Sequence, residues 1–326
     1  MVFIDRDTLS HGMNRLGTDR EPFLWSISYN LRKGFLIPRP LEQDDVLWQI
    51  GRHGNCHHIP KPRSHPSLTV TGPTPPDRYA RMFARVREGL MRGDSFLANL
   101  TATTAVECSG SLRDVFLCSD APFRLLIDDS FVCFSPEPFV TISGRRIATF
   151  PMKGTADASI PGADRALMES YKETCEHHTI VDLMRNDLNS VAEEVTVERF
   201  RYMQTIQTSA GPILQTSSEI SGILPEEKAL RFGDVILPML PAGSITGAPK
   251  SATVRLIAEA EEADRGWYTG VFGYFDGSMM QTAVMIRCIQ RGADGQLFFH
   301  SGGGITVNSS EKEEYHEMLA KVYLSR

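Results

Sequence analysis

The sequence has few of the features that mark several protein classes. Its six cysteines among 326 residues include no Cys-x-x-Cys pair, which argues against a disulfide framework and for reduced thiols in the cytoplasm. No apolar run approaches the ~20 residues that span a bilayer, and no basic segment followed by an apolar one opens the chain. With 34 basic and 40 acidic residues, the net charge of -6 gives no basic surface for nucleic acid. We therefore expect a cytoplasmic protein with no membrane and no nucleic-acid partner.

What is present is a long globular chain with mixed helix and strand signals. Hydrophobic residues make up 41% and charged residues 23%, and the length suits one large domain or two ordinary ones. Apolar periodicity predicts helices at 77–92, 111–119, 173–188, 226–237 and 250–265, with a final helix after a Ser-x-x-Glu capping box at 310–313. Period-2 patterns predict strands at 22–29, 34–37, 95–106, 123–128, 130–134, 140–142, 146–150, 195–203, 267–275, 281–290 and 297–301.

Two polar segments have no such periodicity: residues 51–76, which we expect to be loop-like, and residues 204–218, to which we assign no helix or strand. The first contains six prolines and a group of potential metal ligands, His53, Cys56, His57, His58 and His65. Their spacing matches no closed four-ligand pattern, so a polar surface segment is a better interpretation than a zinc site.

Two Glu-x-x-Glu pairs stand beside apolar helical stripes. Glu173 and Glu176 lie three residues apart, so they share one helix face. Glu314 and Glu317 repeat that spacing in the final helix, with Lys321 one turn later. Carboxylate oxygens suit Mg2+, so the two pairs predict a magnesium site if their helices meet. Two solvated acidic turns are the alternative.

Four other segments have side chains or backbone suited to chemistry. Lys153 follows a strand and precedes a glycine, where it is either a surface charge or a buried nucleophile. Arg287 interrupts an apolar run and needs a carboxylate partner, from the protein or from a ligand. The small-residue loop 241–250 opens a helix, so it is either an oxyanion cradle or a packing turn. The glycine run 302–304 either allows the backbone to approach a ligand closely or forms a tight turn.

Together these segments resemble the chorismate-utilising enzymes. That family includes anthranilate synthase component I, aminodeoxychorismate synthase component I, isochorismate synthase and salicylate synthase. The matching runs occur in the family's order: 93–100, 134–139, 176–188, 241–250, 286–287 and 302–321. Several motifs in one order are specific for this family.

The resemblance implies an α+β fold of the anthranilate/aminodeoxychorismate synthase type, with two packed antiparallel β-sheets surrounded by helices. It implies a single chorismate-binding domain over residues 1–326. In that domain, residues 1–76 form a shortened N-terminal region and residues 77–326 hold the catalytic motifs.

The same resemblance implies a metal site. In the family, Mg2+ bridges protein carboxylates and the ring carboxylate of chorismate. Glu176 and Glu317 correspond to the ligands, and Glu173 and Glu314 support them through water. Lys321 neutralises carboxylate charge.

The remaining implied roles concern the substrate. Arg287 holds the pyruvyl carboxylate of chorismate, helped by the backbone of Gly303 and Gly304. Glu137 is the general acid that assists departure of the C4 hydroxyl. The residues expected to line the substrate pocket are Ser244, Thr246 and Gly247.

Two positions indicate a branch of the family. Lys153 in Pro-x-Lys-Gly-Thr is similar to the aminodeoxychorismate branch, whereas the anthranilate branch has a small residue there. Its amine can add at C2 of chorismate as the C4 hydroxyl leaves, and ammonia can then displace it by attack at C4. Leu97 occupies the position of a water-activating lysine in the isochorismate and salicylate branches, so we do not expect hydration at C2. We expect Mg2+-dependent amination of chorismate at C4, for 4-aminobenzoate and folate biosynthesis.

The sequence also bears on the source of ammonia, and it departs from the family pattern at one position. No Gly-x-Cys-x-Gly glutaminase turn occurs, so we expect ammonia from a separate glutamine amidotransferase subunit or from free ammonium. Gln215 stands where the family commonly has a histidine, and His177 matches a Glu-His pair that we expect to be structural. The alternatives are anthranilate synthase component I and a weakly catalytic protein that binds chorismate-like ligands.

Overall fold

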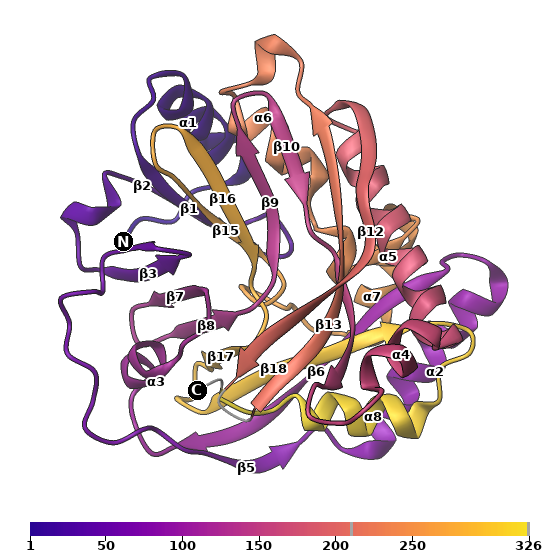
Figure 1. Cartoon of the computed structure of the whole chain (residues 1–326). Helices are drawn as coiled ribbons and strands as arrows, with labels where there is room; N and C mark the ends of the chain where they lie inside the picture. The colour runs from indigo at the N-terminus through magenta and orange to yellow at the C-terminus, as the bar shows by residue number, and fades with distance from the viewer. Residues whose placement is uncertain (209–210, 325–326) are drawn as a thin grey trace.

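A computed structural model describes residues 1–208 and 211–324 (Figure 1). Within these residues the strands form two nine-stranded antiparallel sheets. The first sheet has the order β11 (Met152–Asp157), β13 (Gly211–Ile223), β10 (Arg146–Thr149), β9 (Pro138–Ser143), β16 (Met279–Val284), β15 (Val271–Phe275), β1 (Phe23–Ile27) and β2 (Gly34–Pro38), with β12 (Glu193–Thr208) paired to β13. The second has the order β14 (Gly247–Ala248), β6 (Leu97–Cys108), β18 (Leu297–Ile305), β17 (Cys288–Arg291), β8 (Phe131–Ser135), β7 (Phe123–Ile127), β3 (Val46–Ile50) and β4 (His53–Gly54), with β5 (Leu68–Pro73) paired to β6.

The α-helices lie outside this pair of sheets. Their bounds are α1 (Arg6–Thr18), α2 (Pro76–Arg92), α3 (Leu112–Cys118), α4 (Ala163–Glu169), α5 (Tyr171–Asn189), α6 (Phe232–Ile236), α7 (Lys250–Glu261) and α8 (Glu311–Ala320). In Figure 1, α5 and α8, the helices that carry the two Glu-x-x-Glu pairs, lie toward the same edge of the molecule.

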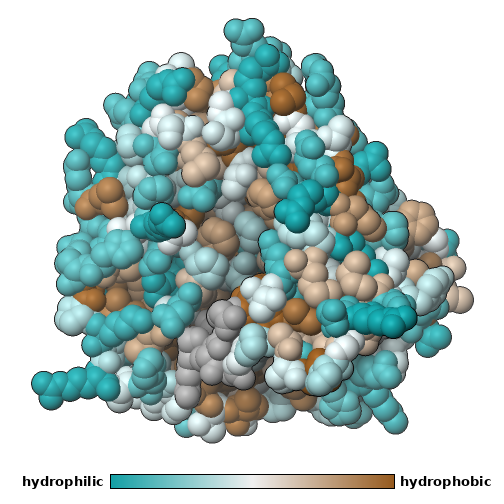
Figure 2. All heavy atoms as spheres, viewed as in Figure 1, coloured by the Kyte–Doolittle hydropathy of each residue, from teal (hydrophilic) through white to brown (hydrophobic). Residues whose placement is uncertain are grey.

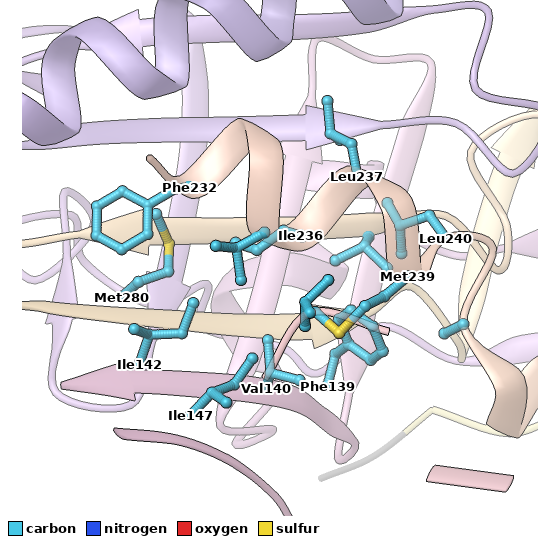
Figure 3. Close-up of a cluster of buried hydrophobic side chains, with 14 of the residues drawn as sticks. Phe139, Val140, Ile142, Ile147, Phe232, Ile236, Leu237, Met239, Leu240 and Met280 are labelled. Carbon is cyan, nitrogen blue, oxygen red and sulfur yellow. The ribbon is translucent and has the colours of Figure 1, made fainter. Parts of the chain in front are cut away.

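Apolar side chains fill the space between the layers. Buried residues of β1, β2, β15 and β16 meet buried residues of β3, β7, β8 and β17, so one core lies between the two sheets. A second core joins the first sheet to α1, α5 and α6. Figure 3 shows part of it, where α6 and the segment after it pack on β9, β10 and β16 through Phe232, Ile236, Leu237, Met239, Leu240, Phe139, Val140, Ile142, Ile147 and Met280. The second sheet packs on α3 and, through β6 and β18, on α2, α7 and α8. The predicted architecture of two packed antiparallel sheets surrounded by helices is confirmed.

The chain changes sheets at Arg287. We expected one strand over 281–290, but β16 ends at Val284 in the first sheet and β17 starts at Cys288 in the second. Between them Arg287 has a φ of 56°, in the left-handed region that non-glycine residues rarely occupy. The expected single strand is therefore wrong, because Arg287 lies at a crossing between sheets.

Other expected elements differ in detail. Residues 204–218, to which we assigned no element, contain strands: β12 extends to Thr208, and β13 pairs with β10, β11 and β12. Polar residues form β13 because strands on both sides satisfy the hydrogen bonds of its backbone N–H and C=O groups. Local composition gives no signal of such pairing. Residues 51–76 contain β5 on the edge of the second sheet. The helix expected at 226–237 is reduced to α6 and short 3-10 turns, and Ser310 begins α8 without the expected side-chain capping bond.

The first fifty residues are part of both sheets. The expected hairpin is present as β1 and β2, and β3 pairs with β7 in the second sheet. Hydrophilic side chains cover much of the face seen in Figure 2. Among the described residues, no helix has the length and apolar character needed to cross a membrane.

Candidate active site

A cavity of about 200 Å³ is lined by residues from both sheets, from α5 and from α8. Ile180 of α5 and Gly302 of β18 both contribute to its wall, so it joins segments far apart in the sequence. Eight of the residues predicted to form the site line this cavity: Glu137, Lys153, Ser244, Arg287, Gly303, Gly304, Glu317 and Lys321.

Lys153 enters the cavity from β11. The pairing of β11 with β13 shifts register between Lys153 and Thr155, and Gly154 between them has a φ of 78°. A glycine in this conformation is typical of a β-bulge, which redirects the neighbouring side chains. The Nζ atom of Lys153 lies 3.4 Å from Glu176 Oε2 on α5. A Cβ atom at Gly154 would lie 2.8 Å from Glu173 Oε2, so the glycine also makes room for the second acid of that pair.

Glu137 directly precedes the first residue of β9. Its carboxylate accepts a hydrogen bond from the Ser244 hydroxyl at 2.7 Å. Its remaining exposed surface faces the cavity, and desolvation by the surrounding protein raises the pKa of Glu137, an effect opposed by Ser244 and by the charges of Lys153 and Arg287. A carboxyl group with a raised pKa retains its proton to higher pH and suits a general acid.

Arg287 lies at the crossing between the sheets, beside Ile286 in the cavity wall. Its guanidinium carbon is 5.1 Å from the ring centre of Tyr323. Stacking of this kind holds a guanidinium plane while leaving its N–H groups available for a carboxylate. The cavity therefore has a planar cation suited to a ligand carboxylate.

Another part of the wall combines the end of α8 with the glycine run of β18. Lys321 Nζ lies 2.8 Å from Glu317 Oε1 and donates to the carbonyl oxygen of Gly302 at 2.8 Å. A Cβ atom at Gly303 would approach Glu314 Oε2 at 3.2 Å, so both acids of the second Glu-x-x-Glu pair reach this strand. The absence of a side chain at Gly303 lets the acidic wall approach the backbone.

The carboxylates suit magnesium by their chemistry, although they are not a complete ligand set. In residues 1–208 and 211–324 no three His, Cys, Asp or Glu side chains group closely enough to hold a metal. Mg2+ commonly takes one or two protein carboxylates and completes its shell with water and substrate oxygens. Glu176 and Glu317 are the residues that would hold Mg2+. In this structure Glu176 pairs with Lys153 and Glu317 with Lys321.

Five predicted site residues are not part of the cavity wall: Glu173, Glu176, Glu314, Thr246 and Gly247. Thr246 is fully buried and donates its hydroxyl to the carbonyl oxygen of Ala242. Gly247 pairs with Ala98 as part of β14, so both residues lie behind the wall that Ser244 and Ile245 form. Their expected pocket-lining role is therefore not supported by their positions. Gln215 pairs with Thr155 in the sheet and also does not contribute to the wall.

Some wall residues were not predicted. Tyr268 is buried beside the ring of His300, and desolvation raises the pKa of its phenol. Asn99 lies within the family-matching run 93–100, but nothing in the sequence predicted a role for this residue itself. Their segments are apolar or β-branched, so sequence patterns indicate a strand and give no signal of a cavity. His177 is buried against Ser218 at 2.7 Å, and burial lowers its pKa to about 4, as suits a neutral structural histidine.

Sequence comparison gives matches over nearly the whole chain. Residues 40–325 match the family described as chorismate binding enzyme. A Haemophilus influenzae protein described as an uncharacterized PabA-like protein is 45% identical over 312 residues, covering 95% of this chain and 94% of that protein. Aminodeoxychorismate synthase component 1 of Escherichia coli is 33% identical over 262 residues, covering 76% of this chain. The match covers 56% of that synthase, so this chain spans little more than half of its length.

Solved structures give the same architecture. MenF, the menaquinone-specific isochorismate synthase from Escherichia coli, has a TM-score of 0.75 over 98% of this chain and 82% of its own. Its sequence identity is 15%, so this likeness concerns the fold. Anthranilate synthase component I from Streptococcus pneumoniae has a TM-score of 0.67 at 25% identity, covering 81% of this chain and 60% of that one.

Proposed function

Because this chain belongs to the chorismate-binding enzyme family, we propose that it aminates chorismate at C4, as aminodeoxychorismate synthase component I. The observation that carries this proposal is the place of Lys153, which lines the same cavity as Glu137 and Arg287. A surface lysine would instead have pointed away from these groups. A lysine nucleophile opposite a general acid is the arrangement that a covalent amination requires.

Substrate binding uses the polar groups of the wall. Arg287 pairs with the pyruvyl carboxylate, and the backbone at Gly303 and Gly304 approaches the ligand closely. Bound Mg2+, held by Glu176 and Glu317, would neutralise the ring carboxylate. Lys321 limits the negative charge of the α8 wall.

The reaction then proceeds by two allylic displacements. Protonated Glu137 gives its proton to the C4 oxygen, and the unprotonated amine of Lys153 forms a bond to C2. The C4–O bond breaks as both conjugated double bonds of the ring shift by one position, and water leaves. Ammonia next attacks C4, both double bonds shift back, and the C2–N bond breaks to release Lys153. The amine at C4 loses a proton to Glu137, which restores the acid.

Ammonia comes from a separate glutamine amidotransferase subunit in this proposal. The chain contains no glutaminase nucleophile turn, and the related synthase is named as a component. Glutamine alone should therefore give no product, whereas ammonium should support turnover. Adding a purified amidotransferase subunit should restore turnover with glutamine.

The deciding experiment is a product assay with chorismate, Mg2+ and ammonium. We expect 4-amino-4-deoxychorismate by chromatography and mass spectrometry, with activity lost on chelation and restored by added Mg2+. Fluorescent anthranilate without an added lyase would instead assign the chain to anthranilate synthase component I, the activity named for the Streptococcus pneumoniae structure. Chorismate binding without turnover would contradict an enzymatic role.

A further inference from the structure

The 3-10 turn Gly243–Ile245, which carries Ser244, is held at each end by one member of an ion pair. At its first residue, the Gly243 amide donates to Asp187 Oδ2 at 2.9 Å. At its last residue, the Ile245 carbonyl oxygen accepts from Arg265 Nη1 at 3.0 Å. Between these two anchors the Ser244 hydroxyl reaches Glu137 at 2.7 Å.

The first anchor joins three segments. Asp187, at the end of α5, is 4% exposed, and its Oδ1 atom lies 2.6 Å from Lys250 Nζ. Lys250, the first residue of α7, also donates to the carbonyl oxygen of Met239. Burial of a carboxylate is costly unless it is paired. The Lys250 ammonium and the Gly243 amide together compensate the buried Asp187 carboxylate.

The second anchor uses the whole guanidinium fork of Arg265. Both Glu261 and Arg265 are nearly inaccessible, and Nε and Nη2 of Arg265 donate to the two Glu261 oxygens at 2.9 and 2.7 Å. Arg265 Nη2 also donates to the Asn99 carbonyl oxygen at 2.6 Å. Glu261 Oε1 accepts from the Thr101 amide at 2.8 Å, so the pair ties the turn to β6.

We propose that Asp187–Lys250 and Glu261–Arg265 are positioning residues that fix the Gly243–Ile245 turn, and so keep the Ser244 hydroxyl on the general acid Glu137. The proposal rests on the function proposed above and adds four residues that do not line the cavity. Neither pair touches Glu137 itself, so each acts through the backbone of the turn. Lys153 and Arg287 face the same carboxylate from β11 and from the crossing between sheets, and neither belongs to these anchors.

The test is an infrared pH titration of the full-length protein without substrate or metal. The carbonyl band of protonated Glu137 is assigned by its loss in Glu137→Gln. Ser244→Ala removes a hydrogen bond to the carboxylate, so the titration should move to higher pH. Arg265→Lys keeps the charge but loses the fork, and it should move the titration in the same direction. In the Ser244→Ala background, Arg265→Lys should add no further shift.

Two further variants make the result decisive. Arg85→Lys is the matched control, because the exposed pair Arg85–Glu259 also ends on α7 and is remote from the turn; it should leave the titration unchanged. If Arg265→Lys does not fold, Asp187→Asn tests the opposite anchor with the same expectation. With chorismate, the anchor variants should lower kcat about tenfold and move the descending limb of the pH–rate profile to higher pH.

An unmoved Glu137 titration in a folded anchor variant would overturn the proposal, as would a shift that persists without the Ser244 hydroxyl. Absence of 4-amino-4-deoxychorismate with wild-type protein would instead reject the proposed function. The infrared titration still decides the positioning role in that case, because it needs no turnover.

Discussion

Two lysine–glutamate pairs lie at the cavity, and they differ in how firmly the lysine is held. Lys153 Nζ lies 3.4 Å from Glu176, and its side chain projects from a bulge in β11. Lys321 Nζ lies 2.8 Å from Glu317 and also donates to the Gly302 carbonyl oxygen. The second contact is within the usual range of a charge-assisted hydrogen bond, and the first is longer.

The difference shows that the same kind of pair, a lysine beside a glutamate, can serve either catalysis or the fixing of charge. A lysine held by two close acceptors is a fixed charge that holds α8 against β18. A lysine with a long contact at a bulge loses little when its amine turns toward a substrate. Lys153 therefore suits a nucleophile and Lys321 suits a fixed electrostatic partner.

The largest expected effect comes from exchanging each lysine for arginine. Lys153→Arg should lower 4-amino-4-deoxychorismate formation by at least ~10³-fold, because a guanidinium stays protonated and does not form the C2 adduct. Lys321→Arg, the matched control, keeps the charge and should retain most activity. Product chromatography measures both, and equal losses in the two variants would refute the division of roles.

The next effect concerns Glu137, the acid that shares the cavity with Lys153. Glu137→Gln should lower kcat by ~10²–10⁴-fold, because the amide has no proton to give. The raised pKa of Glu137 means that wild-type activity should fall as pH increases through that pKa, where the acid form is lost. The variant should lack this descending limb when rates are compared at constant free ammonia. Glu219→Gln, at a salt bridge remote from the cavity wall, is the control, and a retained limb in Glu137→Gln would contradict the acid role.

A smaller effect is expected when the fixed lysine loses its charge. Lys321→Met leaves Glu317 without this partner at a wall that must accept an anionic substrate. The KM for chorismate should increase about tenfold, the cost of one charge-assisted hydrogen bond, while kcat changes less. Initial rates over a chorismate series give both constants, and an unchanged KM would show that Lys321 has no electrostatic part in binding.

The smallest effect is expected at the position where the family commonly has histidine. Gln215 pairs with Thr155, two residues from Lys153, but does not contribute to the cavity wall. Gln215→His should therefore change kcat less than about threefold. A large gain in the steady-state rate would show that this side chain reaches the reacting atoms.

The sequence predicted most of the elements and much of the cavity wall, and its errors have identifiable causes. The helix at 77–92 and the hairpin of β1 and β2 follow from apolar periodicity, which is local. β13 was missed because its stability comes from pairing with strands distant in sequence. Thr246 and Gly247 belong to a correctly identified loop, but their distance from the cavity depends on how that loop turns.

The sequence by itself determined the chemical inventory: two acidic pairs, a lysine before a glycine, an arginine in an apolar run and a glycine run, in an order typical of one family. Each of these motifs is encoded within a few neighbouring residues. Only the tertiary structure decided which groups meet, because the cavity takes its wall from both sheets and two helices. The crossing at Arg287, the bulge beside Lys153 and the two anchors of the Ser244 turn depend on contacts across 20 or more positions of the chain. Such contacts are set by packing and backbone pairing, which no local pattern records.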